Sequence, residues 1–239
     1  MQTDVIIIGA GPVGLLLANL LSSAGIDTVV VEKRHSTVET SRAIGITPPS
    51  LEILEKIELH DTFVKEGVQV QTAVVHGAHG LIGKIDFSHI PGTYPFILSF
   101  PQKRTEEILS SALTGKGTEP GTKPGAETTA GTGSVRVLMG REMVGLHIES
   151  GGISVDTVEN VAGKNPDRRG AEGGESGDLE SPRRIHGRYL CACDGFRSSV
   201  RSITGAAFTE KLYADTFLMG DYRDRSSYGS EAHLFFTAR

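Results

Sequence analysis

The stretch that decides the fold is residues 1–34, MQTDVIIIGAGPVGLLLANLLSSAGIDTVVVEKR. Residues 5–8 are a β-branched run without polar alternation, which is typical of a strand buried on both faces of a parallel sheet. Glycines follow this run directly, and a leucine-rich segment then predicts a helix that ends at the next glycine. Residues 28–31 predict a second buried strand. The order of strand, glycine turn, helix and strand predicts a parallel α/β unit.

The glycines and an acid after them predict a dinucleotide site. Gly9, Gly11 and Gly14 fit a tight turn that lets a pyrophosphate approach the backbone, where free N–H groups at the helix start attract anions. Glu32 follows about 20 residues later, where an acid accepts hydrogen bonds from ribose hydroxyls and repels a 2′-phosphate. The pattern therefore favours FAD or NAD over NADP at this site. A tight strand-to-helix turn without a ligand is the simpler alternative.

Composition excludes several other classes of function. The chain has 239 residues and a net charge of −5, with both signs interspersed, so we expect no nucleic-acid or membrane partner. No apolar segment is long enough to span a bilayer, and the amino terminus lacks the basic region of a signal peptide. These features predict a soluble cytoplasmic protein.

Cysteines and histidines give no metal prediction. Cys191 and Cys193 would project from one face of a strand, too close together for ordinary disulfide geometry, so we interpret them as small core residues. His76, His79 and His89 lie near one another in the sequence, but no acid accompanies them at ligand spacing. We therefore expect no metal site.

Further elements follow the first unit. A helix is predicted from Pro48, with Thr47 as its cap, and another from Gln102, with short β-like runs between them over 68–100. Segments at about 115–134 and 162–184 are rich in Gly, Pro, Ser, Thr and charge, which predicts disordered surface insertions. Between and after these insertions we expect a hairpin or meander, then one strand that ends in Asp194 and Gly195.

Four motifs carry a family resemblance. They are GAGPVG with Glu32 and Lys33, SRAIGI around Arg42, QKRTEEIL opening on Gln102, and YLCACDGFRSSVR containing Asp194. The last is the most specific, and together the motifs span residues 4–201. The chain resembles the amino-terminal part of the class A flavoprotein monooxygenases, which include the para-hydroxybenzoate, phenol and polyketide hydroxylases.

The resemblance implies a fold and a domain plan. The expected class is α/β, a Rossmann-like FAD-binding domain with three layers and a mostly parallel sheet, joined to a partial β-rich substrate domain. We expect residues 1–69 and 96–205 to form the FAD-binding domain, and residues 70–95 and 206–239 to form the partial substrate-domain sheet.

The resemblance also implies a set of cofactor-binding residues. The set comprises Gly9, Gly11, Gly14, Glu32, Lys33, Arg42, Gln102 and Asp194. Arg42 would contact FAD on the flavin side, Gln102 would lie near the ribityl chain, and Asp194 would lie beside the pyrophosphate. Taken singly, each of these three residues has a simpler interpretation. Arg42 would be a solvated loop charge, Gln102 a helix cap and Asp194 a turn residue before glycine.

The implied activity is that of an FAD-dependent monooxygenase. Such an enzyme uses NADPH or NADH and O₂ to hydroxylate an aromatic or polyketide-type small molecule, as in secondary-metabolite biosynthesis. The cofactor carries out the chemistry, so the sequence demands no side-chain nucleophile or general base, and no catalytic residue is named.

One departure from the family pattern leaves alternatives open. The family's Gly-Asp motif that wraps the flavin is missing, since Gly220 and Asp221 are followed by Tyr222 and Arg223. We therefore expect a truncated chain, and a non-catalytic FAD-binding remnant or interaction module is the alternative function. An NAD-dependent oxidoreductase ranks last, because it leaves Arg42 and the Asp194 motif unexplained.

Overall fold

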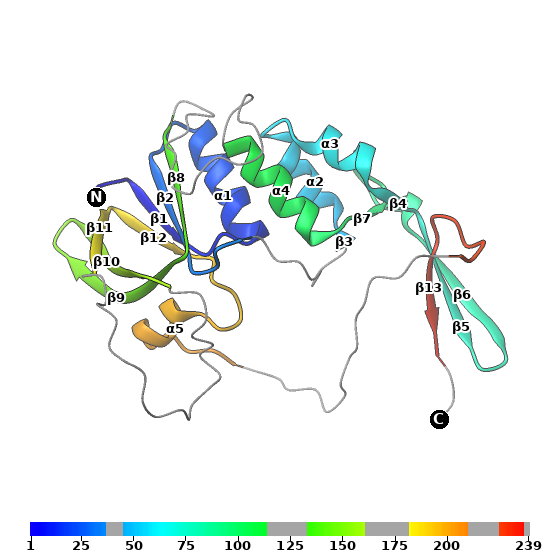
Figure 1. Ribbon diagram of the computed structural model, residues 1–239. Coiled ribbons are helices and arrows are strands. Elements are labelled where there is room, and N and C mark those ends of the chain that lie inside the picture. Colours follow the sequence, from blue (N-terminus) through cyan, green and yellow to red (C-terminus); the bar gives the residue numbers. More distant parts are fainter. Residues whose placement is uncertain (37–44, 114–132, 161–181, 210–224, 237–239) are drawn as a thin grey trace. The chain divides into compact units, whose positions relative to one another are not determined.

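The chain divides into two compact units. The computed structural model describes residues 1–36, 45–113, 133–160, 182–209 and 225–236 (Figure 1). One unit comprises Met1–Thr37 and Glu106–Leu212, and the other comprises Val38–Thr105 and Tyr213–Arg239. The domain limits expected from the sequence stay a prediction.

A parallel sheet forms the centre of the first unit. It has four strands in the order β12-β1-β2-β8. The strands are β1 (Val5–Ile8), β2 (Thr28–Glu32), β8 (Val135–Met139) and β12 (Tyr189–Ala192). All three pairings are parallel, and every residue of β1 and β2 is buried. Continuous burial explains why these two strands consist almost entirely of β-branched residues.

Helices cover one face of this sheet. The helix α1 (Pro12–Ser23) starts with proline, whose missing N–H costs nothing in the first turn. It buries Leu15 and Ala18, and it lies beside α4 (Gln102–Leu113), because Asn19 Nδ2 donates a hydrogen bond of 2.9 Å to the Leu109 carbonyl (Figure 1). Gly25, at φ +78°, follows the end of α1.

An antiparallel sheet covers the other face. Its strands, in the order β11-β10-β9, are β9 (Arg141–Glu149), β10 (Gly152–Glu159) and β11 (Arg183–Gly187). The short helix α5 (Ser199–Thr204) packs beside it. Both sheets and α5 contribute to one apolar core, which contains Ile6, Ile8, Val29, Val31, Met143, Val155, Ile185 and Val200. The unit therefore has three layers of helices, parallel sheet and antiparallel sheet (Figure 1), which confirms the predicted α/β class.

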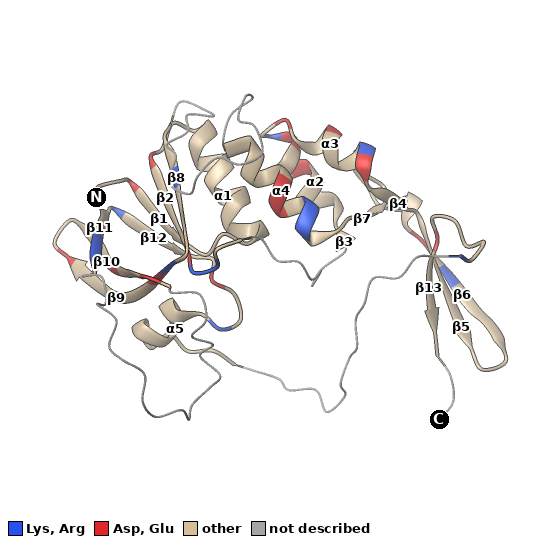
Figure 2. Cartoon of the chain, viewed as in Figure 1, with Lys and Arg blue, Asp and Glu red and all other residues tan. Residues whose placement is uncertain are grey.

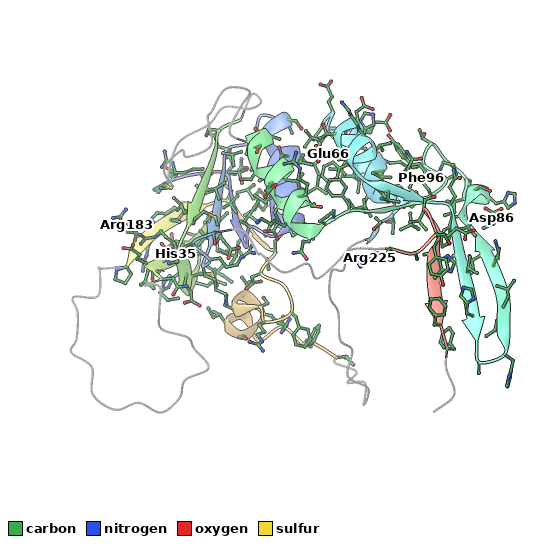
Figure 3. All side chains as sticks on the ribbon, turned by 45° about the vertical axis from the view of Figure 1, so that its right-hand side comes forward. His35, Glu66, Asp86, Phe96, Arg183 and Arg225 are labelled. Atoms are coloured by element: carbon green, nitrogen blue, oxygen red, sulfur yellow. The ribbon has the colours of Figure 1, made fainter. Side chains whose placement is uncertain are left out.

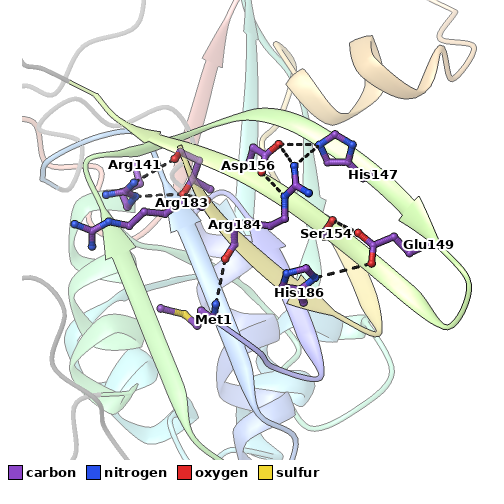
Figure 4. A network of polar contacts seen from close by, with 10 residues as sticks. Met1, Arg141, His147, Glu149, Ser154, Asp156, Arg183, Arg184 and His186 are labelled. Atoms are coloured by element: carbon purple, nitrogen blue, oxygen red, sulfur yellow. Dashed lines mark hydrogen bonds and ion pairs between the residues drawn. The ribbon is translucent and has the colours of Figure 1, made fainter. Parts of the chain in front are cut away.

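A polar network crosses the exposed face of the antiparallel sheet (Figure 4). Asp156 accepts hydrogen bonds from Arg184 Nε at 2.7 Å and from His147 Nε2 at 2.7 Å. The hydrogen bonds from Arg184 and His147 lower the pKa of Asp156. Arg184 lies on β11, Asp156 on β10 and His147 on β9. The network therefore links all the strands of the sheet and favours one register.

The hairpin or meander expected between the two insertions is confirmed, because β9 and β10 pair antiparallel. Residues 135–139 are not part of this hairpin, because they add to the parallel sheet as β8, and Gly140 at φ +69° turns the chain into β9. The single strand expected before Asp194 is two strands, β11 and β12, which lie in different sheets and separate at Arg188.

Most of the two predicted insertions lies outside the described residues. Where the second insertion was expected to end, at about 184, Arg183 and Arg184 already belong to β11. Its predicted end was therefore slightly too late.

The second unit combines short helices with two small sheets. Its helices are α2 (Pro48–Glu55), α3 (His60–Glu66) and the 3₁₀ helix η1 (Phe87–His89). One sheet is β3 (Gly45–Ile46), β7 (Ile97–Ser99) and β4 (Val68–Val70), and the other is β13 (Ala232–Phe235), β5 (Thr72–Gly77) and β6 (Gly80–Asp86). Phe63 and Phe100 pack with ring centroids 4.9 Å apart, and Glu66 pairs with Arg104 at 2.8 Å. Glu66, labelled in Figure 3, is the last residue of α3.

The helix predicted from Pro48 is present as α2. Thr47 occupies the cap position, but its side chain makes no capping hydrogen bond to the backbone, and its hydroxyl lies 3.2 Å from that of Ser50. Proline at the first helical position is thus the stronger start signal here.

The described ranges show charges of both signs and no candidate metal site. Acidic and basic side chains are interspersed, as on α4, which carries both signs (Figure 2). Among the described residues, no three His, Cys, Asp or Glu side chains are arranged to hold a metal ion, and His76 instead contacts His233 at 2.8 Å. No helix in these ranges is long and apolar enough to cross a membrane.

Candidate functional site

The glycines after β1 serve different purposes. Gly9 has φ +102°, and a Cβ added there would lie 2.4 Å from the Cys193 carbonyl oxygen. A Cβ added at Gly14 would lie 1.9 Å from the Gly9 carbonyl oxygen. These two glycines therefore permit close packing of β1, α1 and the end of β12. Gly11 is different, because a Cβ there would meet no heavy atom within 4 Å.

The open position at Gly11 coincides with the start of α1. Gly11 is the N-cap residue, with φ −77° and ψ −178°, and no side chain caps the helix. The first N–H groups of a helix have no intrahelical partner and carry the positive end of the helix dipole. The turn therefore presents exposed backbone and partial positive charge on the side where Gly11 leaves space.

Glu32 lies at this turn. Glu32 is 5% exposed, and its Oε2 accepts a hydrogen bond of 2.7 Å from the Ala10 N–H. Burial by itself would raise the pKa of Glu32, but hydrogen bonds from Arg34 and from the Ala10 N–H outweigh it, so the pKa lies below its usual value. A charged carboxylate is thus held directly beside the glycine turn.

Arg34 is a site residue that the sequence prediction missed. Its Nε donates to Glu32 Oε1 at 2.9 Å, its Nη2 donates to Glu32 Oε2 at 3.1 Å, and its Nη1 lies 3.4 Å from Glu106 Oε2. The hydrogen bond with Glu32 raises the pKa of Arg34. Its position two residues after the acid was the available signal. Glu106 gave none, because it stands in the polar start of a helix yet is fully buried.

Asp194 lies beside the same turn. The Asp194 Cα would be 3.0 Å from a Cβ added at Gly9, and its Oδ2 accepts hydrogen bonds from the Ser199 and Val200 N–H groups at 2.6 and 3.2 Å. Burial opposes ionisation, but hydrogen bonds from Ser198, Val200 and Ser199 lower the pKa of Asp194 below its usual value. Its Oδ1 is buried and has no hydrogen-bond partner among the described residues. A buried carboxylate oxygen of this kind suits a ligand donor.

The other predicted site residues are placed as follows. Lys33 is exposed, and its carbonyl accepts a hydrogen bond of 2.8 Å from Asn160 Nδ2. Gln102 opens α4 and is counted with the second unit. Arg42 lies outside the described residues. The structure thus brings together Gly9, Gly11, Gly14, Glu32 and Asp194.

The two cysteines flank this region. Cys191 and Cys193 are free thiols and only half-buried. They are therefore less buried than the core residues that the sequence predicted. Burial nevertheless raises the pKa of both thiols, which keeps them protonated near neutral pH.

Comparisons with known proteins agree with this geometry. The family described as "FAD binding domain" matches residues 2–136. The chain is 29% identical over 219 residues to rifampicin monooxygenase of Rhodococcus hoagii, and this similarity covers 91% of the chain and 37% of that protein. It is 31% identical over 210 residues to 12-dehydrotetracycline 5-monooxygenase/anhydrotetracycline 6-monooxygenase of Streptomyces rimosus subsp. rimosus, with 87% and 34% covered.

A solved structure extends the likeness to the fold. The anhydrotetracycline hydroxylase OxyS of Streptomyces rimosus superposes with a TM-score of 0.65 at 27% identity, over 89% of this chain and 36% of OxyS. The chain thus spans 34–37% of the length of the two curated relatives. Since the family match covers more than half of the chain and includes the glycine turn and Glu32, the chain belongs to the family described as FAD binding domain.

Proposed function

We propose that the chain binds FAD at the turn between β1 and α1 and acts as an FAD-dependent monooxygenase. The substrate class is an aromatic or polyketide-type small molecule, hydroxylated with O₂ and electrons from NADPH or NADH, in secondary-metabolite biosynthesis. The observation that carries the proposal is the Glu32 carboxylate on the Ala10 N–H, beside the open backbone at Gly11.

The residues present fit FAD. A Cβ at Gly11 would fill the open position where the backbone can approach a pyrophosphate, and the start of α1 offers N–H groups to its charge. Asp194 keeps one buried carboxylate oxygen without a partner among the described residues. We propose that Gly9, Gly11 and Gly14 hold the pyrophosphate, that Glu32 accepts from the adenosine ribose, and that Asp194 lies beside the pyrophosphate. Lys33, Arg42 and Gln102 complete the proposed set by the family resemblance.

FAD and the chain would supply different parts of the activity. When bound, FAD supplies the redox and oxygen-transfer chemistry. The chain binds the dinucleotide, fixes its orientation through β1, β2 and β12, and discriminates against a 2′-phosphate through the negative charge of Glu32. For the substrate, the two curated relatives are named for rifampicin and for tetracycline intermediates, which supports a polycyclic aromatic polyketide.

A spectrum and an oxidation assay test the proposal. The purified chain should show flavin absorbance, or acquire it after incubation with FAD and removal of the excess. It should then oxidise NADPH or NADH in an oxygen-dependent reaction that phenolic compounds stimulate. A colourless chain that does not take up FAD would contradict the proposal at its first step.

A second candidate function is FAD binding without hydroxylation. The observation that favours it is the share of the curated relatives that this chain spans, 34–37%. A chain that binds FAD but oxidises neither NADPH nor NADH with phenols present would select this function over the first.

A further inference from the structure

The Glu32 carboxylate already accepts four hydrogen bonds from the chain. Oε1 accepts from the Arg34 backbone N–H and from Arg34 Nε, both at 2.9 Å. Oε2 accepts from the Ala10 N–H at 2.7 Å and from Arg34 Nη2 at 3.1 Å. An ionised carboxylate offers about four lone-pair positions. A ribose hydroxyl pair that donates to Glu32 must therefore replace two of these donors.

The Arg34 guanidinium is the donor group that can give way. The Ala10 N–H belongs to the turn between β1 and α1, and the Arg34 N–H lies two residues after the end of β2, so the backbone holds both. The Arg34 side chain, in contrast, is 29% exposed on a flexible stem. Its fork covers both oxygens of Glu32, which are the positions that a pair of ribose hydroxyls would take.

Glu106 gives this guanidinium a further partner, besides Glu32 and the Ala10 carbonyl oxygen, which accepts from Arg34 Nη2 at 3.2 Å. The Glu106 side chain is fully buried, and its Oε2 lies 3.4 Å from Arg34 Nη1. A buried charge is costly unless it is paired, so the guanidinium is strongly favoured at this end. Arg34 can thus release Glu32 while it stays paired with Glu106.

We propose that Glu106 is a positioning residue of the ribose site, which draws the Arg34 guanidinium off Glu32 when the adenosine ribose binds. This inference rests on the proposed function, since it takes FAD as the ligand and Glu32 as its ribose acceptor. Without the negative charge of Glu106, Arg34 stays on Glu32 and competes with the ribose hydroxyls.

Quenching of flavin fluorescence in an FAD titration tests the proposal. Glu106→Gln should raise the Kd by about tenfold, the effect of one charge-assisted interaction. Arg34→Met removes the competing fork and should lower the Kd by about threefold. The double variant Arg34→Met/Glu106→Gln should return to the Kd of Arg34→Met. Glu107→Gln, at the next position of the same helix, is the matched control and should keep the Kd of the natural chain.

The outcomes separate this inference from the proposed function. If the natural chain binds no FAD, the proposed function fails and the inference fails with it. If the natural chain binds FAD, the inference alone is overturned when Glu106→Gln has no effect, or when the double variant binds as weakly as Glu106→Gln, because a purely structural role of Glu106 is not rescued at Arg34. If circular dichroism shows that Glu106→Gln does not fold, the Kd of Arg34→Met for FAD becomes the test. Weaker FAD binding by Arg34→Met than by the natural chain then overturns the inference.

Discussion

A methyl group added at Gly11 would meet no heavy atom within 4 Å, whereas one added at Gly14 would lie 1.9 Å from the Gly9 carbonyl oxygen. We therefore expect Gly11→Ala to fold, with a stability loss of about 1 kcal/mol at most from the changed cap. Its methyl group would stand where the pyrophosphate approaches, so the Kd for FAD should rise by at least about tenfold. Denaturant unfolding and flavin fluorescence measure the two effects.

Gly14→Ala should show the reverse order of effects. Because its clash is with backbone, the turn must shift, and we expect a loss of about 2–4 kcal/mol in the free energy of unfolding. If Gly14→Ala is as stable as the natural chain, or if Gly11→Ala binds FAD normally, the assignment of roles within the turn is wrong.

The lowered pKa of Glu32 predicts a pH dependence of stability. Its folded pKa lies below the ordinary value of 4.5, so its contribution is fully present above pH 4.5 and is lost as the pH falls through the folded pKa. Glu32→Gln cannot titrate. The stability difference between the natural chain and Glu32→Gln, measured by urea unfolding, should therefore be largest near neutral pH and shrink below pH 4.5.

Glu142→Gln, on β9, is the control for acid sensitivity in general. A difference between the natural chain and Glu32→Gln that stays constant, or that grows on acidification, would show that Glu32 is not stabilised in its charged form.

At this scale the sequence predicted the turn better than the groups around it. Glu32 was found because its spacing from the glycines has a direct geometric meaning. Arg34 and Glu106 were not found, because 72 residues separate them and their contact exists only in the fold. Glu106 also stands among charged neighbours, a pattern that favours a solvated helix face, and nothing local reveals that it is fully buried.

Among the elements, the strand β1 is buried along its whole length. Ile6 is fully buried in the core shared by the two sheets and α5. Ile6→Ala should lower the free energy of unfolding by about 2–5 kcal/mol, since it removes buried methyl groups and leaves a cavity. Denaturant unfolding followed by circular dichroism measures this loss.

Ile148→Ala on β9 provides the matched control, because Ile148 is 82% exposed. This variant should change the free energy of unfolding by about 0.5 kcal/mol at most. Equal losses for the two variants would mean that the core is not where the structure places it.

Element types were easier to predict than element partners. The helix α1 and the strands β1 and β2 follow from local hydrophobic patterns. The pairing of β8 with β2 joins residues more than 100 positions apart, as for Thr28 and Val135, and an apolar run does not reveal which sheet receives it. The break at Arg188 was missed for the same reason, because β11 and β12 are separated by one residue but lie in different sheets.

For the whole molecule, FAD binding should appear as added stability. A ligand that binds only the folded state at 100 times its Kd adds about 2.7 kcal/mol to the free energy of unfolding. FAD should therefore raise the thermal midpoint in a concentration-dependent way, and hydrogen exchange should slow around the turn and β2. A midpoint that does not respond to FAD, or slowed exchange confined to the second unit, would argue against the site.

Equilibrium dialysis of the purified chain against FAD, with Glu32→Ala in parallel, tests directly whether Glu32 accepts the ribose of FAD at the glycine turn. We expect saturable binding of one FAD per chain and a Kd at least about tenfold higher for Glu32→Ala, because the ribose loses its acceptor. Equal affinity of the two chains, or no saturable binding by the natural chain, would contradict this expectation.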